Sequence, residues 1–282
     1  MSIRNKPQTA PCQSINANGK LLSFDEPLLM GILNVTPDSF FDGGMHNTTH
    51  SALRKAKELL HDGADIIDLG AYSSRPGAAP ITTQQELDRA IPVIEALVNE
   101  VPDALISIDT FRSEVARAAI GAGAHLINDI SGGTLDENMF STVAELQVPY
   151  ILMHMRGTPE TMATLTDYTD IVQDIALYFG EKIAYLRKLG VKDIILDPGF
   201  GFAKTIEQNY ELLYRIAELQ YFDLPILGGI SRKSMIYKKL GITAQEALNG
   251  TTVLHTLLLD RGVQLLRVHD VKEAKQLLQL IR

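Results

Sequence analysis

Residues 28–35 read Leu-Leu-Met-Gly-Ile-Leu-Asn-Val, a short apolar run interrupted near its end by the polar side chain of Asn34. The apolar residues do not alternate with polar ones, so both faces of an extended segment are suited to burial. Strands of this kind belong to parallel sheets that are covered on both faces. The run therefore predicts a buried parallel strand with a polar group at its carboxyl end.

Seven further runs repeat this design, because they are short, rich in Ile, Leu and Val, and end in or near polar residues. They lie at 65–71, 104–110, 126–131, 150–155, 194–199, 225–231 and 263–269. The 235 positions from Asn34 to His269 make seven repeats of about 34 residues. A repeat of this length accommodates one strand, one helix and two loops.

Amphipathic stretches lie between the runs, for example at 49–61, 83–100, 168–189, 205–219 and 243–260. Thr82 and Thr243 have the character of helix starts, and Thr243 with Glu246 has the spacing of a capping box. Eight strand–helix units in a row predict the α/β class and a closed (β/α)8 TIM barrel. An open doubly wound sheet is the alternative, but no Gly-x-Gly-x-x-Gly follows the first strand.

The segment before the first strand has a different character. Residues 1–12 are expected to form a loose tail, and a small hairpin is expected within 14–24, with Asn18-Gly19 at its turn. We therefore divide the chain into a tail and hairpin, residues 1–27, and one barrel domain, residues 28–282.

The composition is that of an ordinary globular protein, with 45% hydrophobic and 21% charged residues among 282. A net charge of −8 gives no basic face, so nucleic-acid binding is not expected. No apolar run approaches the ~18 residues that span a membrane. The single cysteine, Cys12, forms no intrachain disulfide, and we expect a soluble, cytoplasmic protein.

Polar residues stand at the carboxyl ends of all eight predicted strands, where a barrel of this type has its active site. They are Asn34, Asp68, Ser73, Ser74, Arg75, Asp109, Asn128, Asp129, His154, Asp197, Ser231, Arg232, Lys233, Arg267 and His269. The opposite ends, such as Leu28, Leu105 and Ile194, are apolar. Any single polar residue could be only a helix cap or a loop hydrogen-bonder, but together they predict a deep polar pocket.

The polar groups of this pocket suit a flat heterocycle with an amino-amide edge, such as a pterin. Asp109 and Asp197 supply acceptors, whereas Asn128 can accept and donate. Ring N–H groups would donate to the carboxylates, and ring acceptors would accept from Asn128 and Lys233. Each aspartate could instead be a structural partner of a backbone group or an arginine.

Lys233, Arg267 and His269 form a basic cluster after the last two strands, where barrels frequently bind phosphate. The alternative for Lys233 and Arg267 is a salt bridge to the pocket aspartates. Asn34 offers a neutral oxygen to a Mg²⁺ ion that keeps most of its water and grips a phosphate. It could equally cap a turn at the end of its strand.

Two loops have the composition of lids, since they combine Gly and Pro with hydroxyl, charged or aromatic side chains. They span residues 36–44, with Phe40 and Phe41, and residues 73–80. Loops of this kind carry function on a rigid scaffold and can close over a ligand. Adjacent aromatic side chains such as Phe40 and Phe41 need a partner.

The motifs at these strand ends resemble those of dihydropteroate synthases. The first reads Gly31-Ile-Leu-Asn34-Val-Thr-Pro-Asp-Ser-Phe40 followed by Asp42-Gly-Gly44, and the second reads Ser73-Ser-Arg-Pro-Gly77. The others follow in the family's order: Ser107-Ile-Asp109-Thr, Asn128-Asp-Ile, Asp197-Pro-Gly-Phe-Gly201-Phe, Ser231-Arg-Lys233-Ser234 and Arg267-Val-His269-Asp270. Seven ordered motifs from about residue 28 to the C-terminus make the resemblance highly specific.

The resemblance implies a pterin-binding (β/α)8 enzyme over residues 28–282. It would condense 6-hydroxymethyl-7,8-dihydropterin pyrophosphate with p-aminobenzoate, giving 7,8-dihydropteroate and pyrophosphate for folate biosynthesis. The family is a sulfonamide target, is usually a homodimer and uses Mg²⁺. We expect no covalent enzyme intermediate and no Ser-His-Asp triad, because the reaction needs charge stabilisation and positioning.

The resemblance also assigns roles to residues. The catalytic set is Asn34, Lys233, Arg267 and His269. The pterin contacts are Asp109, Asn128, Asp197, Lys233 and Arg267. The pyrophosphate contacts are Asn34, Ser73, Ser74, Arg75, Arg267 and His269, with Mg²⁺ on Asn34. The p-aminobenzoate contacts are Phe40, Ser74, Pro76, Phe202, Lys233 and Ser234.

The chain departs from the family's pattern in two places. The second motif begins Gly70-Ala71-Tyr72-Ser73-Ser74 where the family usually has Gly-Gly-Glu-Ser-Thr, and Phe41 stands where Ser is common. Neither change removes an ionic contact, so activity is expected, whereas sulfonamide sensitivity is not fixed by the sequence. Two alternatives remain: a folate-dependent methyltransferase domain, which would lack the first-loop and Ser-Arg-Lys motifs, and a non-catalytic pterin-binding homologue.

Overall fold

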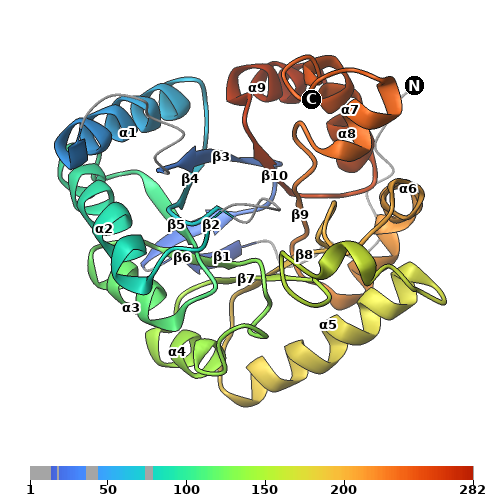
Figure 1. Ribbon diagram of the computed structural model, residues 1–282, viewed down its shortest axis with the longest axis horizontal. Coiled ribbons are helices and arrows are strands. Elements are labelled where there is room, and N and C mark those ends of the chain that lie inside the picture. The colour runs from blue at the N-terminus through green and yellow to red at the C-terminus, as the bar shows by residue number, and fades with distance from the viewer. Residues whose placement is uncertain (1–13, 18, 36–43, 74–78, 282) are drawn as a thin grey trace.

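A ring of parallel strands surrounded by helices forms the body of the protein (Figure 1). The computed structural model describes residues 14–17, 19–35, 44–73 and 79–281. Its eight-stranded sheet consists of β3 (Leu28–Asn34), β4 (Ile66–Gly70), β5 (Leu105–Asp109), β6 (Leu126–Asp129), β7 (Tyr150–Met153), β8 (Ile194–Asp197), β9 (Leu227–Gly228) and β10 (Leu265–Val268). Each predicted apolar run contains one of these strands, which confirms the repeat.

The sheet closes on itself. The strands pair in parallel in the order β8-β7-β6-β5-β4-β3-β10-β9. A parallel bridge joins Leu196 to Ile226 between the two ends of this order, and the Leu196 N–H donates to the Pro225 carbonyl at 2.8 Å. The predicted TIM barrel is therefore confirmed, and the open-sheet alternative is wrong because the two end strands meet.

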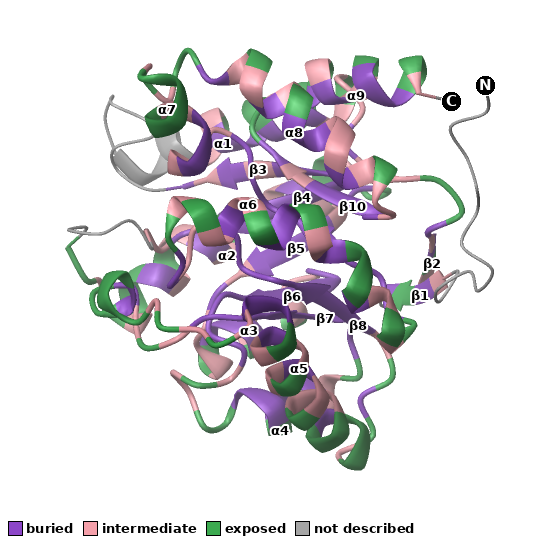
Figure 2. Cartoon of the chain, turned by 90° about the vertical axis from the view of Figure 1, so that its right-hand side faces the viewer, coloured by how far each residue is buried: buried purple, intermediate pink, exposed green. Residues whose placement is uncertain are grey.

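Helices pack around the outside of the ring (Figures 1 and 2). They are α1 (Gly44–His61), α2 (Thr83–Glu100), α3 (Ser113–Gly121), α4 (Met139–Leu146), α5 (Ile171–Lys188), α6 (Ile206–Arg215), α7 (Ser234–Leu240), α8 (Leu248–Asp260) and α9 (Val271–Leu280), with 3₁₀ segments η2 (Met162–Thr164) and η3 (Ile216–Phe222). All five predicted amphipathic stretches contain a helix. Of the described helices, none is both long and apolar enough to cross a bilayer.

Two helix boundaries differ from the sequence prediction. Thr243 does bond to Glu246 Oε2, through its N–H at 2.9 Å and its Oγ1 at 2.8 Å. That contact closes a turn rather than starting the helix, which begins only at Leu248. The helix expected over 205–219 is α-helical only to Arg215 and continues as η3. By contrast, Thr82 caps α2 as expected, since its Oγ1 accepts from the Gln85 N–H at 3.2 Å.

The predicted hairpin is confirmed, and it seals one end of the barrel. Strands β1 (Ser14–Ala17) and β2 (Lys20–Ser23) pair antiparallel, and the Gly19 N–H donates to Asn16 Oδ1 at 2.7 Å. The hairpin side chains pack on residues from the barrel strands, forming the cluster Ile15, Ala17, Leu22, Phe24, Met30, Ile66, Leu126, Ile151, Ile195, Leu227 and Leu265. Figure 2 places the hairpin at one end of the barrel. The division at residue 27 stays a prediction.

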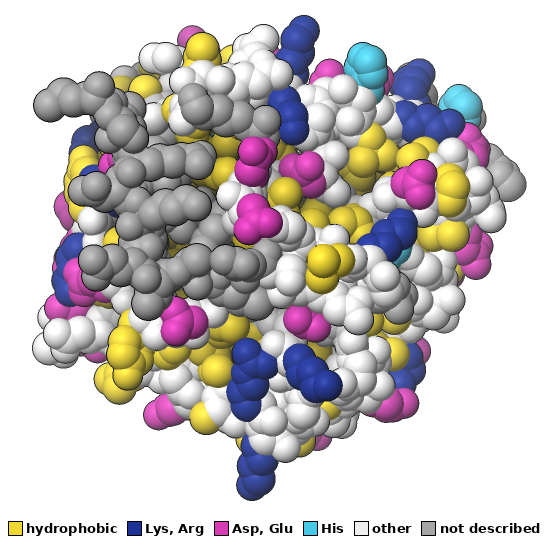
Figure 3. Space-filling model, turned by 180° about the vertical axis from the view of Figure 1, so that it is seen from behind, with side chains coloured by type: hydrophobic (Ala, Val, Ile, Leu, Met, Phe, Trp, Pro, Cys, Tyr) yellow, Lys and Arg dark blue, Asp and Glu magenta, His cyan; other side chains and the backbone are white. Residues whose placement is uncertain are grey.

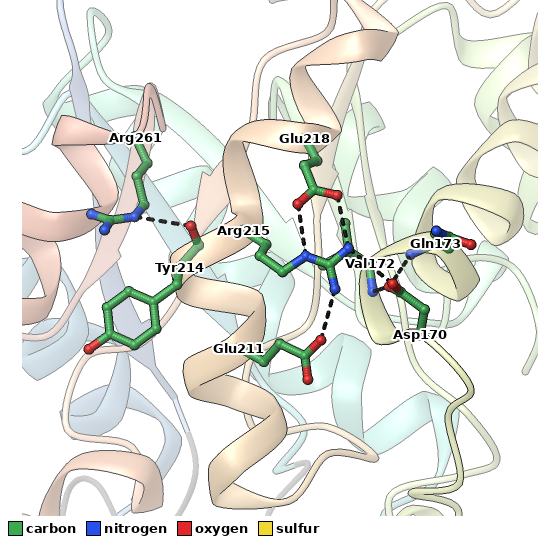
Figure 4. Close-up of polar contacts among 8 residues, drawn as sticks. All are labelled: Asp170, Val172, Gln173, Glu211, Tyr214, Arg215, Glu218 and Arg261. Atoms are coloured by element: carbon green, nitrogen blue, oxygen red, sulfur yellow. Dashed lines mark hydrogen bonds and ion pairs between the residues drawn. The ribbon is translucent and has the colours of Figure 1, made fainter.

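Polar contacts fasten the outer layer, and one set of them lies around Arg215 (Figure 4). Arg215 donates to Glu211 at 2.8 Å and to Glu218 at 2.8 and 3.0 Å. It also reaches Asp170 Oδ2 at 3.1 Å, whose other oxygen caps the start of α5. One guanidinium thus joins α6, η3 and the first turn of α5. On the face seen in Figure 3, coloured basic and acidic side chains are interspersed.

The hairpin provides a test of this packing. Leu22 is 5% exposed and faces the barrel, whereas its neighbour Leu21 is 76% exposed. Leu22→Ala should lower the free energy of unfolding by about 2–4 kcal/mol, because it leaves a cavity beneath the strands. Leu21→Ala is the matched control and should change it by less than about 0.5 kcal/mol. Urea unfolding followed by circular dichroism measures both, and equal effects would contradict the sealing role.

Candidate active site

A pocket opens at the carboxyl ends of the barrel strands. Its lining comes from strands on every side of the ring and from the loops that follow them. The lining residues are Ile32, Asp109, Asn128, Ile130, Met153, Asp197, Phe202, Gly229, Ser231, Lys233, Arg267 and His269. Eight of the residues that the sequence predicted for the pocket or its substrates therefore meet in one place. The strand-end prediction of a polar pocket is confirmed.

Other predicted site residues are not part of this lining. Asn34 is the last residue of β3, Ser73 follows β4, and Ser234 begins α7. The remaining predictions, Phe40, Ser74, Arg75 and Pro76, lie outside the described residues. The lid predictions for residues 36–44 and 73–80 fall largely there too.

The sequence did not point to four lining residues: Ile32, Ile130, Met153 and Gly229. The apolar members give no chemical signal in the sequence, since they look like any other buried strand residue. Ser231 was among the predicted strand-end residues, although no substrate contact was assigned to it. Together with Phe202, the apolar side chains give the pocket nonpolar walls that suit the faces of a flat ring.

Arg267 is held between two carboxylates from other strands. Its Nε donates to Asp68 Oδ2 and its Nη2 to Asp109 Oδ2, both at 2.6 Å. Asp68 is fully buried, and β3 and β4 separate β10 from β5 in the ring, so the guanidinium reaches across the barrel. Burial acts to lower the pKa of Arg267, but the charges of Asp68 and Asp109 outweigh it and raise the pKa. The salt-bridge alternative is therefore what the structure shows for Arg267.

Asn128 and Arg267 both donate to the same oxygen, Asp68 Oδ2. Its Nδ2 donates to Asp68 Oδ2 at 3.0 Å inside the barrel. A carboxylate can only accept, so the amide nitrogen is fixed on the Asp68 side and Oδ1 is turned away from it. Asn128 therefore offers an acceptor more readily than the donor to a ring acceptor that the sequence interpretation gave it.

The two predicted pocket aspartates differ in exposure: Asp197 is 7% exposed, whereas the side chain of Asp109 is 21% exposed. Burial raises the pKa of Asp109 to about 7, although the charge of Arg267 opposes the shift. Burial also raises the pKa of Asp197, against the charge of Lys233. The Gly199 N–H donates to Asp197 Oδ1 at 2.8 Å, which fixes the carboxylate at the end of β8. Both groups thus favour a partner that carries N–H donors or positive charge.

Lys233 forms no described ion pair with the aspartates, so the salt-bridge alternative is wrong for this residue. Its Nζ donates to the Phe200 carbonyl and lies 4.7 Å from the centre of the Phe202 ring. Burial lowers its pKa to about 8, although the charge of Asp197 opposes this. The ammonium is therefore partly desolvated and faces the same space as Asp197.

A second lysine, Lys204, stabilises the loop after β8. Lys204 Nζ contacts the Gly199 carbonyl at 2.9 Å, the Phe202 carbonyl at 3.0 Å and His154 Nδ1 at 3.1 Å. Gly199 has φ +72, and a Cβ there would lie 2.0 Å from the His154 carbonyl, so only glycine fits. His154 therefore supports the loop and does not line the pocket.

The loop after β9 is joined to β10. Ser231 Oγ accepts from the His269 N–H at 3.1 Å and lies 3.0 Å from His269 Nδ1. Arg232 forms a bidentate ion pair with Asp270, through Nε to Oδ2 at 2.8 Å and through Nη2 to Oδ1 at 2.6 Å. These contacts fix the His269 ring next to Arg267, so two cationic or donor side chains lie together on one side of the pocket.

The residues near Asn34 fit a Mg²⁺ ion that is bound mainly through a substrate. A Cβ at Gly70 would lie 3.4 Å from Asn34 Oδ1 and 3.6 Å from Asp109 Oδ2, so both oxygens lie close to the backbone of Gly70. Among the described residues, no group of three His, Cys, Asp or Glu side chains could hold a metal. A single neutral oxygen suits Mg²⁺, which keeps several waters and takes its other ligands from phosphate.

Comparison with known proteins shows which family and which relatives this chain resembles. The family described as pterin binding enzyme matches residues 30–269. The chain is 42% identical over 267 residues to dihydropteroate synthase of Escherichia coli K12, covering 94% of each chain. It is 46% identical over 252 residues to dihydropteroate synthase of Synechocystis, covering 88% of this chain and 87% of the relative.

Solved structures agree with the sequence relatives. Yersinia pestis dihydropteroate synthase, solved with a sulfonamide drug, superposes with a TM-score of 0.88 at 41% identity, covering 95% of this chain and 97% of that one. The Xanthomonas albilineans enzyme with 4-aminobenzoic acid gives 0.88 at 38% identity, covering 96% and 97%. With its barrel, its pocket and these relatives, the chain belongs to the dihydropteroate synthase family of pterin-binding transferases in folate biosynthesis.

Proposed function

We propose that this enzyme joins 6-hydroxymethyl-7,8-dihydropterin pyrophosphate to p-aminobenzoate at the described pocket, releasing 7,8-dihydropteroate and pyrophosphate. The observation that carries the proposal is the convergence of Asp109, Asn128 and Asp197 with Lys233 and Arg267 in one pocket with nonpolar walls. Three acceptor side chains and two cations in one pocket match the edge of a pterin ring. Structures of relatives with p-aminobenzoate and with 7,8-dihydropteroate support both substrate halves.

In the proposed reaction the exocyclic C–O bond of the pterin breaks, and pyrophosphate leaves with the electron pair. The amine nitrogen of p-aminobenzoate forms the new C–N bond and then loses a proton. Positive charge develops on the dihydropterin as the C–O bond breaks. Asp109 and Asp197 stabilise that charge, because two desolvated carboxylates are already fixed around the ring site.

The leaving pyrophosphate is assigned to Arg267 and His269, with Asn34 nearby at the end of β3. Arg267 can donate to phosphate oxygens through its guanidinium, and His269 is fixed beside it by Ser231. Mg²⁺ held at Asn34 would neutralise charge on the departing group. Ser73 belongs to the same side of the barrel mouth, and the proposed roles of Ser74 and Arg75 rest on the family resemblance.

The p-aminobenzoate site is assigned to Phe202, Lys233 and Ser234, next to the pterin pocket. Lys233 Nζ lies over the Phe202 ring, so a cation and an aromatic face are presented together. The aromatic amine is a modest nucleophile that needs positioning rather than deprotonation. The contributions of Phe40, Ser74 and Pro76 rest on the family resemblance.

The proposal is tested by pyrophosphate release from the purified enzyme with both substrates. Asp197→Asn should lower kcat/KM for the pterin substrate by about 30- to 1000-fold, because an amide presents a donor to ring N–H groups. Asp193→Asn, at the opposite end of β8, is the control and should leave turnover unchanged. Absence of pyrophosphate release by the wild type would favour the non-catalytic alternative, which its relatives do not support.

Lys233 links activity and stability. Its pKa falls from 10.5 to about 8 on folding, so below about pH 8 its charge disfavours the folded state, and this penalty shrinks as pH rises towards 10.5. Lys233→Met should raise the melting temperature of the ligand-free enzyme by about 3–6 °C at pH 7 and by less at pH 10, while activity is lost. Lys238→Met, on the exposed side of α7, is the control. A lower melting temperature at pH 7 would contradict this prediction.

We also propose a homodimer formed through α6, α7 and α8. Helix α8 carries no charged side chain before Asp260, although it lies on the outside of the barrel. Val253 on α8, Leu240 on α7 and Tyr214 on α6 are each more than half exposed, at 52%, 57% and 56%. An outer helix normally presents charges to water, so this face is suited to burial against a second copy.

Sedimentation velocity tests the dimer. The wild type should sediment at about twice the 31.0 kDa mass of one chain. Val253→Asp should give the monomer, because it introduces a charge into the apolar face. Leu177→Asp, on exposed α5, should remain dimeric. A monomeric wild type would remove the proposal.

A cytoplasmic location is proposed as well, since the single cysteine forms no intrachain disulfide.

A further inference from the structure

Asp68 contacts two pocket residues without lining the pocket itself. It is fully buried in the middle of β4, where the neighbouring residues are Ile67 and Leu69. Through the single oxygen Oδ2 it accepts from Arg267 Nε at 2.6 Å and from Asn128 Nδ2 at 3.0 Å. A carboxylate in an otherwise apolar strand is costly unless it is paired, so its position calls for a specific role.

The two contacts have different chemical consequences. For Asn128, the contact decides which end of the amide points away from β4, because Asp68 can accept but not donate. For Arg267, it fixes Nε on the inner side, so that Nη2 reaches Asp109 and the plane of the guanidinium is set. Asp68 therefore controls one acceptor and one cation of the pterin pocket at the same time.

We propose that Asp68 is the positioning residue of the pterin pocket, which orients the Asn128 amide and the Arg267 guanidinium for the ring without touching it. This inference rests on the proposed function, because it assigns Asn128 and Arg267 to the pterin. It predicts an effect confined to the pterin half of the reaction. Phe202 and Ser234, assigned to p-aminobenzoate, lie after β8 and at the start of α7, and the hydrogen bonds described for Asp68 go to Arg267 and Asn128 instead.

Three variants separate the oxygen, the charge and the packing. Asp68→Asn keeps an acceptor oxygen and removes the charge, so KM for the pterin pyrophosphate should rise by only about 3- to 10-fold. Asp68→Leu removes the acceptor, so that KM should rise by more than about 30-fold, with KM for p-aminobenzoate within about 3-fold. Ser107→Ala is the matched control, since Ser107 is fully buried and pairs in register with Asp68. It should behave as wild type.

A second pair of variants covers the case in which Asp68→Leu does not fold. Asn128→Asp places two carboxylates about 3 Å apart and should abolish measurable binding of 6-hydroxymethylpterin in calorimetry. Adding Asp68→Asn lets the introduced amide donate to the introduced carboxylate, so binding should recover by at least about 10-fold. Recovery would show that the side chains at positions 68 and 128 act on each other directly in the pocket.

The outcomes are distinct. Wild-type pyrophosphate release with both substrates establishes the proposed function, whatever the variants do. A pterin-selective rise in KM for Asp68→Leu, partial rescue by Asp68→Asn and recovery in the double variant support the positioning role. Equal effects on both KM values, an Asp68→Asn variant as impaired as Asp68→Leu, or no recovery in the double variant would overturn it.

Discussion

The ion pairs of Arg267 with Asp68 and Asp109 are the interaction on which the active site depends. They join β10, β4 and β5 across the barrel, at 2.6 Å on each side. Two carboxylates this near to one another, one fully buried and one partly buried, are tolerated only with a cation between them. Arg267 makes the acidic side of the pocket possible, and through Asp68 it is connected to Asn128. The same network of side chains therefore balances the buried charges and presents the groups proposed to bind the pterin.

The barrel supplies the rigidity that this network needs. Parallel pairing aligns Gly70 with Asp109, and Asp109 with Asn128, on adjacent strands, so these groups are set by the sheet register and not by loops. The hairpin closes the opposite end with Ile15, Leu22 and Phe24. One end of the barrel is therefore filled with side chains, and the other is left to bind ligands.

Most of the fold and much of the site could be predicted from the sequence. Eight apolar runs indicate eight strands because both faces of a parallel barrel strand are buried, and polar residues at their ends mark the pocket. Side-chain contacts between residues far apart in the sequence cannot be predicted from a local sequence pattern. The residues next to Lys233 and Arg267 in the sequence do not indicate that Arg267 pairs with aspartates and Lys233 does not. They also do not indicate that Asp68 contacts Asn128. Thr243 shows the same limit, since its capping contact precedes a turn.

Several polar groups of the ligand-free pocket already have partners within the protein, and this constrains what can bind. Asp109 is occupied by Arg267, and Lys233 by the Phe200 carbonyl. A ligand must offer contacts that replace or supplement these, or it leaves buried polar groups without partners. A flat ring with N–H donors on one edge and acceptors on another can do so for Asp109, Asp197 and Lys233 together. A ring lacking those groups is rejected by the pocket's own ion pairs, so selectivity follows from the network that stabilises the free enzyme.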